Sequence, residues 1–240
     1  MRNKRAAFTL VELLVVLIII AMLVALLQPT DRGSSREHLR QSKCQNNLKQ
    51  IGLALLTYAN EHGTLPPAYT TDADGKPLHS WRTLILPYLE EATLFKKIDL
   101  TKPWDDPVNA AAAKAIVPVF ECPSAAVERP RTTYFAVVTP NSCLRADSPR
   151  RLSDIKDKSK AILVIEVDAD HAVPWVQPVD ADEQLFFATT QSERHSHPGI
   201  FHAVFADGHV EAISTETPPE ELREMLGIPS TNQAEAVEAK

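Results

Sequence analysis

The stretch Phe8-Thr9-Leu10-Val11-Glu12-Leu13-Leu14-Val15-Val16-Leu17 decides the fold of this 240-residue chain. It opens an apolar run that extends from Phe8 to Leu27, contains Glu12 as its single charge, and follows a basic leader, Met-Arg-Asn-Lys-Arg-Ala-Ala. About 20 helical residues extend roughly 30 Å, the thickness of the hydrocarbon core of a bilayer. A carboxylate inside such a span costs about 3 kcal/mol unless a partner neutralises it, so we expect Glu12 to have a specific role.

Two simpler interpretations of this stretch leave Glu12 unexplained. A secretory signal peptide has a shorter apolar core followed by a small-residue cleavage site, whereas this run continues into Leu26-Leu27-Gln28-Pro29. A plain membrane anchor fits the length of the run, and the basic leader would hold the N-terminus in the cytoplasm. An anchor alone has no use for a carboxylate within the span.

Residues 7–14, Ala-Phe-Thr-Leu-Val-Glu-Leu-Leu, resemble the N-terminus of type IV prepilins, a family that includes the pseudopilins of type II secretion. The resemblance implies that the prepilin peptidase/methyltransferase cuts between Ala7 and Phe8 and methylates the new amino group of Phe8. It also implies that Glu12 pairs with the N-terminal amine of another pilin-like subunit during assembly, which would compensate the buried charge. Ala7 stands where the family usually has Gly.

The charge balance argues against nucleic acid as a partner. The chain has a formal net charge of −6, from 25 basic and 31 acidic residues. Removal of the leader would leave 22 basic residues and a net charge of −9. Nucleic-acid-binding domains are basic, because affinity depends on contacts to phosphates. No Gly-rich phosphate-binding pattern is present either.

Helical periodicity returns beyond the apolar run. Cys44, Leu48, Ile51, Leu55 and Tyr58 follow one another at spacings of four, three, four and three residues, which predicts one apolar stripe. A helix that ends before Gly63 would fit this pattern. We therefore expect one long helix over residues 8–62. The expected organisation is a leader (1–7), a transmembrane segment (8–29), an extracytoplasmic head (30–229) and a disordered tail (230–240).

The rest of the chain predicts an α+β head with a small antiparallel sheet packed on the long helix. Strands are expected at 132–138, 161–167, 201–205 and 209–213, a turn at 69–75, and short helices at 90–97, 109–115 and 220–226. Asp207-Gly208 lies between two apolar runs, which is a strong hairpin signal.

Histidines gather near the C-terminus and raise the question of a metal site. The candidate ligands are His195, His197, His202, Asp207 and His209. Alternating strand geometry gives no reason for them to converge. The alternative, which we favour, is that Asp207 and Gly208 form a turn and His197 bonds to nearby backbone, with no metal.

Four ordered motifs resemble a bacterial family of unknown function, domain-of-unknown-function family 1559, whose members begin with a prepilin-type N-terminus. They are residues 44–55 (Cys-Gln-Asn-Asn-Leu-Lys-Gln-Ile-Gly-Leu-Ala-Leu), residues 80–90 (Ser-Trp-Arg-Thr-Leu-Ile-Leu-Pro-Tyr-Leu-Glu), Cys122-Pro123-Ser124, and His197 followed after nine residues by Asp207-Gly208. The resemblance implies a pilin-like architecture and an extracytoplasmic location rather than an activity.

The three cysteines allow two interpretations. Cys44 and Cys122 both fall in the family motifs, and the resemblance favours a disulfide between them. Three buried free thiols, including Cys143, remain the alternative. None of the three has the close spacing of a zinc site.

No other pattern predicts a cofactor or catalysis. Asp72-x-Asp74-Gly75 matches part of a calcium loop, and Asp168, Asp170, Asp180 and Asp182 form a second acidic group. We expect these to be solvated turns, with calcium as the open alternative. Ser124 and Ser142 have no recognisable catalytic partners, so we do not expect an enzyme.

The sequence thus predicts a structural subunit of a type IV pilus-like or pseudopilus-like assembly, held in the inner membrane with its N-terminus in the cytoplasm and its head in the periplasm or at the cell surface. The alternative is a membrane-tethered binding or sensing module that never polymerises. A metal-dependent enzyme is the third hypothesis.

Overall fold

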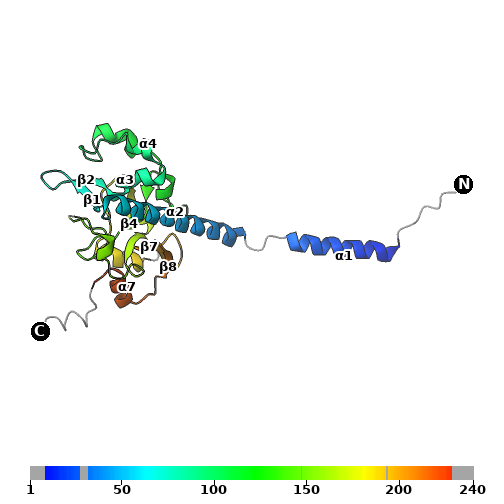
Figure 1. Cartoon of the computed structure of the whole chain (residues 1–240). Coiled ribbons are helices and arrows are strands. Elements are labelled where there is room, and N and C mark those ends of the chain that lie inside the picture. The colour runs from blue at the N-terminus through cyan, green and yellow to red at the C-terminus, as the bar shows by residue number, and fades with distance from the viewer. Residues whose placement is uncertain (1–8, 28–31, 147, 193, 229–240) are drawn as a thin grey trace. The chain divides into compact units, whose positions relative to one another are not determined.

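The computed structural model describes residues 9–27, 32–146, 148–192 and 194–228 (Figure 1). Two compact units are present, residues 1–39 and 40–240. The second unit is called the head below, and the expected boundaries of the transmembrane segment and the head stay predictions. The expected leader (1–7), the join between membrane and head helices (28–31) and the tail (230–240) lie outside the described residues.

The N-terminal helical region is observed as two helices, α1 (Leu10–Leu27) and α2 (Arg32–His62). Because residues 28–31 are outside the described part, the continuity of the expected helix over 8–62 stays a prediction. The predicted stripe on α2 is confirmed, since Cys44, Leu48, Ile51 and Leu55 are all fully buried. Gly63 follows α2 with φ +78, the left-handed conformation that commonly ends helices.

A four-stranded antiparallel sheet in the order β4-β5-β7-β8 forms the centre of the head. Its strands are β4 (Tyr134–Ala136), β5 (Ile162–Glu166), β7 (Ile200–Phe205) and β8 (Val210–Ser214). The β7–β8 hairpin has the predicted Asp207-Gly208 turn, and Gly208 adopts φ +86. The expected α+β class with a pilin-like N-terminal helix is confirmed.

Two small antiparallel ribbons accompany the sheet. One pairs β1 (Tyr69–Thr71) with β2 (Pro77–Ser80), and the other pairs β3 (Arg131–Thr132) with β6 (Val173–Pro174). The prediction of a turn over 69–75 is therefore wrong for 69–71, which form a strand, and right for the residues that follow. The Asp72 carboxylate accepts bonds from the backbone N–H groups of Asp74 and Lys76, which closes this turn.

Short helices connect the strands. The α-helices are α3 (Trp81–Leu84), α4 (Ala92–Phe95), α5 (Ala110–Ala113), α6 (Glu183–Thr190) and α7 (Pro219–Met225). The 3₁₀ helices are η1 (Leu86–Leu89), η2 (Pro107–Asn109), η3 (Pro118–Phe120), η4 (Leu152–Asp154) and η5 (Ala169–His171). Helix α6 was not predicted; its N-cap residue is Asp182, whose carboxylate accepts a bond from the Leu185 N–H.

Each face of the sheet covers a separate apolar core. The core on the α2 face includes Val164 and Val204, and the core on the other face includes Phe135, Phe201 and residues of α6 and α7. Helix α2 approaches the sheet closely at Gly52, where a Cβ atom would lie 2.5 Å from Cγ2 of Val204. This contact places the first turns of α2 within the head directly over β5 and β7.

Candidate functional site

The N-terminus of α1 is capped by reciprocal hydrogen bonds between Thr9 and Glu12. The Glu12 carboxylate Oε2 accepts bonds from the Thr9 N–H at 2.9 Å and the Thr9 hydroxyl at 3.0 Å, and the Glu12 N–H donates to Thr9 Oγ1 at 3.3 Å. This is a capping box of the form Thr-x-x-Glu, which the sequence analysis did not consider. Glu12 thus has a local structural role in the isolated chain. Ala7 and Phe8, the expected cleavage pair, lie outside the described residues.

The large apolar side chains of α1 from Leu10 to Val24 are exposed on every side of the helix in the isolated chain. Their exposed fractions run from 42% at Val16 to 79% at Leu10. None of the helices that the structure describes is both long and apolar enough to cross a membrane.

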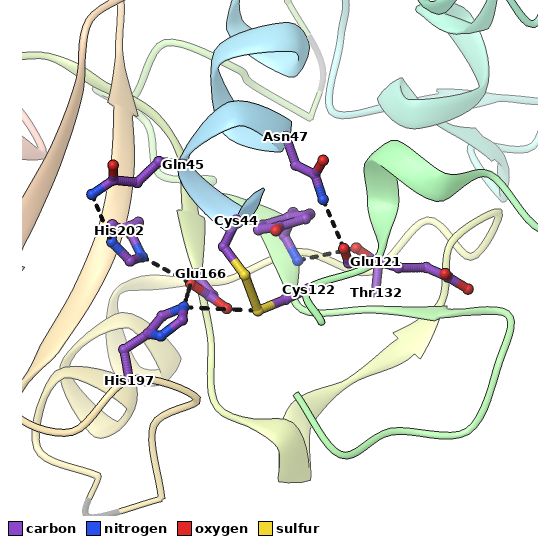
Figure 2. Close-up of a disulfide and its surroundings, with 10 residues drawn as sticks. Cys44, Gln45, Asn47, Glu121, Cys122, Thr132, Glu166, His197 and His202 are labelled. Carbon is purple, nitrogen blue, oxygen red and sulfur yellow. Dashed lines mark hydrogen bonds and ion pairs between the residues drawn. A yellow bond between two sulfur atoms is a disulfide. The ribbon is translucent and has the colours of Figure 1, made fainter. Parts of the chain in front are cut away.

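A disulfide between Cys44 and Cys122 ties α2 to the segment after η3 (Figure 2). The two Cα atoms lie 5.2 Å apart, within the range that disulfides require. This is the pair favoured by the sequence motifs. Cys143 is a free, buried cysteine, and burial raises the pKa of its thiol to about 12, so it stays protonated and unreactive in the folded head.

Three ionisable side chains converge beside the disulfide: Glu166 at the end of β5, His197 in the loop before β7, and His202 within β7 (Figure 2). Glu166 Oε2 lies 3.2 Å from His202 Nδ1 and 3.5 Å from His197 Nε2. His197 Nε2 also lies 3.8 Å from the Cys122 sulfur. All three side chains are at most 3% exposed, so this is a dry polar cluster.

Gln45 on α2 extends the polar contacts of the cluster. The Gln45 Nε2 lies 3.2 Å from His202 Nε2. An amide nitrogen can only donate, so His202 Nε2 is the acceptor in this contact, and the other ring nitrogen, Nδ1, faces Glu166. The second carboxylate oxygen, Glu166 Oε1, is buried without a hydrogen-bond partner among the described residues.

Strand alternation explains why these side chains meet. In β7, Phe201, Ala203 and Phe205 face the α6–α7 core. His202 and Val204 therefore face α2. Glu166 lies on the same face of β5, where α2 presents Cys44 and Gln45. Tyr134, on the neighbouring strand, borders the cluster, and burial together with the Glu166 charge raises the pKa of its phenol well above the ordinary range.

The expected histidine group is only partly brought together. His197 and His202 converge on Glu166, and the ring of His197 faces the disulfide. His195 stacks on Phe201 instead. Asp207 and His209 bond to each other at 2.6 Å in the hairpin turn, and Gly208 makes the turn itself. The sequence analysis missed Glu166, although a single acid at the end of an apolar strand was a usable signal.

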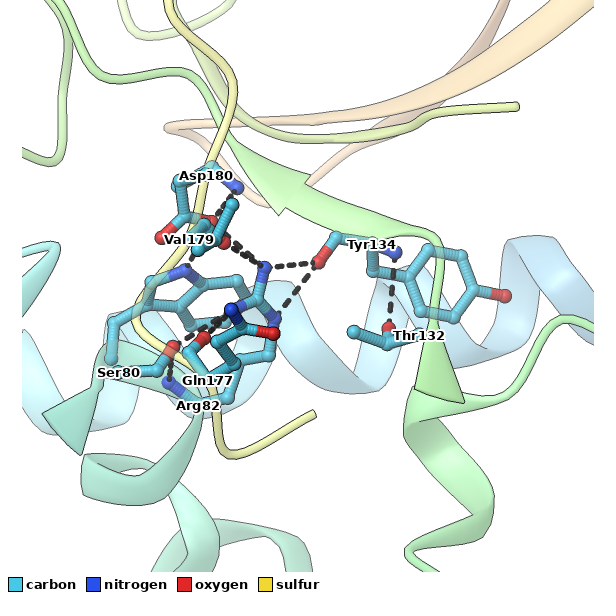
Figure 3. A network of polar contacts seen from close by, with 9 residues as sticks. Ser80, Arg82, Thr132, Tyr134, Gln177, Val179 and Asp180 are labelled. Atoms are coloured by element: carbon cyan, nitrogen blue, oxygen red, sulfur yellow. Dashed lines mark hydrogen bonds and ion pairs between the residues drawn. The ribbon is translucent and has the colours of Figure 1, made fainter. Parts of the chain in front are cut away.

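The motif at 80–90 forms a second buried polar network, which is also absent from the sequence analysis (Figure 3). The Arg82 guanidinium pairs with the Asp180 carboxylate at 2.8 Å, with exposed fractions of 0% and 4%. Arg82 also donates to the Tyr134 carbonyl, and Asp180 accepts from Trp81 Nε1 and the Ala136 N–H. The network joins α3, β4 and the strand-like segment before α6.

The four aspartates considered for calcium have separate structural roles. Asp180 belongs to the Arg82 network, and Asp182 caps α6. Asp168 caps η5, and Asp170 pairs with Arg194 at the surface. Among the described residues, these four aspartates do not gather into one candidate metal site.

Two comparisons identify parts of the chain. Residues 2–27 match the prokaryotic N-terminal methylation motif, which marks the chain as a prepilin-like protein and is typical of membrane-anchored, exported proteins processed by prepilin peptidase. No curated protein and no solved structure matches the chain. Residues 33–191 match a family described as "Protein of unknown function (DUF1559)", a region that includes Cys44, Cys122 and Glu166 and ends before His197. Since this match covers more than half of the sequence, the chain belongs to the DUF1559 family of proteins of unknown function.

Proposed function

We propose that this chain is a structural subunit of a type IV pilus-like or type II secretion pseudopilus-like assembly, without a catalytic role. The observation that carries the proposal is the N-terminal methylation motif at residues 2–27, which contains the apolar helix α1 with its single carboxylate. In this role prepilin peptidase removes the leader, and α1 mediates contact with other subunits.

The chemistry of α1 supports this role. A helix that is apolar on all sides is stable only when lipid or other apolar helices surround it. Residues 8–29 would therefore lie in the inner membrane before assembly and among the α1 helices of other subunits afterwards. The basic leader would face the cytoplasm and the head the exterior.

Glu12 is the critical position, because two roles compete for it. In the first, its charge pairs with the N-terminal amine of a neighbouring subunit; in the second, its carboxylate only completes the capping box with Thr9. A glutamine can fill the same position of a capping box but carries no charge. The two roles therefore predict different outcomes for the same substitution.

We expect Glu12→Gln and Glu12→Leu to leave membrane insertion unchanged and to reduce incorporation into filaments by at least about tenfold, which corresponds to about 1.4 kcal/mol. Thr9→Val, which removes the hydroxyl of the cap but keeps the charge, should still assemble. The measurement is the amount of each variant in the sheared filament fraction relative to the membrane fraction of its host. Wild-type assembly of Glu12→Gln would contradict charge pairing and leave capping as the role of Glu12.

The second candidate function is a tethered binding module, and a cavity in the head favours it. This cavity has a volume of about 540 Å³ and is lined by residues that include Arg150, Lys156, Lys160 and Glu224. Its volume is typical of small-molecule sites. An uncleaved anchor would suffice for such a module.

The N-terminus of the protein from its native membrane separates the two functions. For an assembling subunit we expect an intact mass that corresponds to a chain beginning with N-methylated Phe8, because the motif directs cleavage after Ala7. The measurement is mass spectrometry with N-terminal sequencing, with Ala7→Arg as the variant that should block cleavage. A native chain that still begins at Met1 would contradict the filament role and favour the tethered module.

A further inference from the structure

The surroundings of the disulfide are those of a metal site. One donor atom from each of Cys44, Cys122, Glu166 and His197 lies within 4.8 Å of the other three, and all four residues are buried. Two sulfurs, one imidazole nitrogen and one carboxylate oxygen form a donor set that suits Zn²⁺. We propose that, when the disulfide is reduced, these four side chains bind one zinc ion.

The distances already approach a tetrahedral cage. Zinc bond lengths of about 2.0–2.2 Å to N and O place neighbouring N and O donors about 3.4 Å apart, and His197 Nε2 lies 3.5 Å from Glu166 Oε2. A zinc-bound sulfur and nitrogen are about 3.6 Å apart, and the Cys122 sulfur lies 3.8 Å from His197 Nε2. The main change required is separation of the two sulfurs to about 3.8 Å.

An unpartnered atom and a supporting hydrogen-bond chain strengthen the assignment. Glu166 Oε1 is buried without a hydrogen-bond partner among the described residues, a costly arrangement that binding of the cation by both carboxylate oxygens would relieve. Glu166 Oε2 is oriented by His202, which is oriented in turn by Gln45. Hydrogen bonds of this kind to the ligand side chains are usual around protein zinc sites, where they fix the direction of each ligand.

A route to the site is present as well. A cavity of about 280 Å³ is lined by Cys122 together with Lys43, Glu121 and Arg129. Cys122 thus forms part of the wall of a cavity, and a reductant in this cavity would lie beside one of the two cysteines that it must reduce. A phosphine reductant with water converts the disulfide into two thiols and a phosphine oxide, and zinc then displaces the two thiol protons.

Zinc would replace the disulfide as the link between α2 and the segment after η3. The head would then keep the same connection in an oxidising or a reducing environment. This inference does not depend on the filament role, since it concerns the head alone.

The test uses the full chain in detergent, reduced with a phosphine, freed of reductant without oxygen, and compared with the oxidised chain. We expect the reduced chain to bind one Zn²⁺ and the oxidised chain none, as measured by elemental analysis after gel filtration. Co²⁺ serves as the spectroscopic probe, because thiolate ligands give charge-transfer absorption that the other histidines of the chain cannot produce.

Matched variants locate the site. Cys44→Ser/Cys122→Ser and His197→Ala should lose stoichiometric binding, and His202→Ala should weaken it about 10–100-fold. Cys143→Ala and His195→Ala, which change a cysteine and a histidine outside the cage, should bind as wild type does. Circular dichroism on every variant verifies that the head is folded.

The proposal would be overturned if the reduced wild-type chain bound no zinc. It would also be overturned if the chain bound Co²⁺ without the absorption of thiolate ligands. Full binding by folded His197→Ala would remove that residue from the cage and contradict the site as assigned. The comparison of oxidised with reduced wild-type chain requires no substitution, so misfolding of a variant cannot leave the question open.

Discussion

Replacing Asp180 by alanine is expected to lower the free energy of unfolding of the head by about 3–5 kcal/mol. The substitution leaves the Arg82 guanidinium fully buried without its counter-charge. It also removes the acceptor for Trp81 Nε1 and for the Ala136 N–H. The measurement is urea unfolding of the detergent-solubilised chain followed by tryptophan fluorescence, because all three tryptophans (Trp81, Trp104 and Trp175) belong to the head.

A surface ion pair provides the control for this prediction. Arg194 and Asp170 form a contact of 2.7 Å, but their side chains are 74% and 52% exposed. Asp170→Ala should therefore change stability by less than about 1 kcal/mol. If Asp180→Ala and Asp170→Ala had similar small effects, the buried network would not be a major contribution to the stability of the head.

Removal of the disulfide by Cys44→Ala/Cys122→Ala is expected to lower the free energy of unfolding by about 4.5 kcal/mol, the value that loop entropy gives for a closed loop of this length. The two cysteines are separated by 78 positions in sequence, so the cross-link strongly restricts the unfolded chain. Chemical unfolding with a metal chelator present measures the loss without any contribution from bound zinc.

The matched control is Cys143→Ala, which removes a buried thiol and no cross-link. It should cost about 1 kcal/mol, because it deletes one sulfur atom from a packed region. If both variants lowered the free energy of unfolding by the same amount, packing of the sulfurs, rather than the covalent link, would be what stabilises the head.

The parts of the fold that sequence predicts correctly are those with local signals. The stripe from Cys44 to Leu55 repeats at helical spacing, and Asp207-Gly208 needs only its flanking strands to form a hairpin. Helix α6 lacked such a signal: its sequence, Glu-Gln-Leu-Phe-Phe-Ala-Thr-Thr, is short and ends in aromatic and β-branched residues. Its one local mark was the cap at Asp182.

The sequence predicted single residues of the candidate site but not their arrangement. The family motifs pointed separately to Cys44, Cys122 and His197, but Glu166 completes the cluster from a strand whose sequence is otherwise apolar. The contact between His197 and Glu166 depends on the pairing of β5 with β7 and on the packing of α2 against these strands. Those contacts join residues far apart in sequence, and no local pattern encodes them.

The sheet of the head has one protected and one open edge. Along β4, the segment at Ala181 closes the edge through bonds with Ala136 and Val138. Strand β8 has β7 as its single neighbour in the described sheet, so no second strand of the described residues covers its outer edge. Such an edge invites strand-to-strand aggregation when many copies are crowded together. Glu211, exposed on β8, places a negative charge there and disfavours pairing between two identical edges, which would keep crowded heads from fusing their sheets.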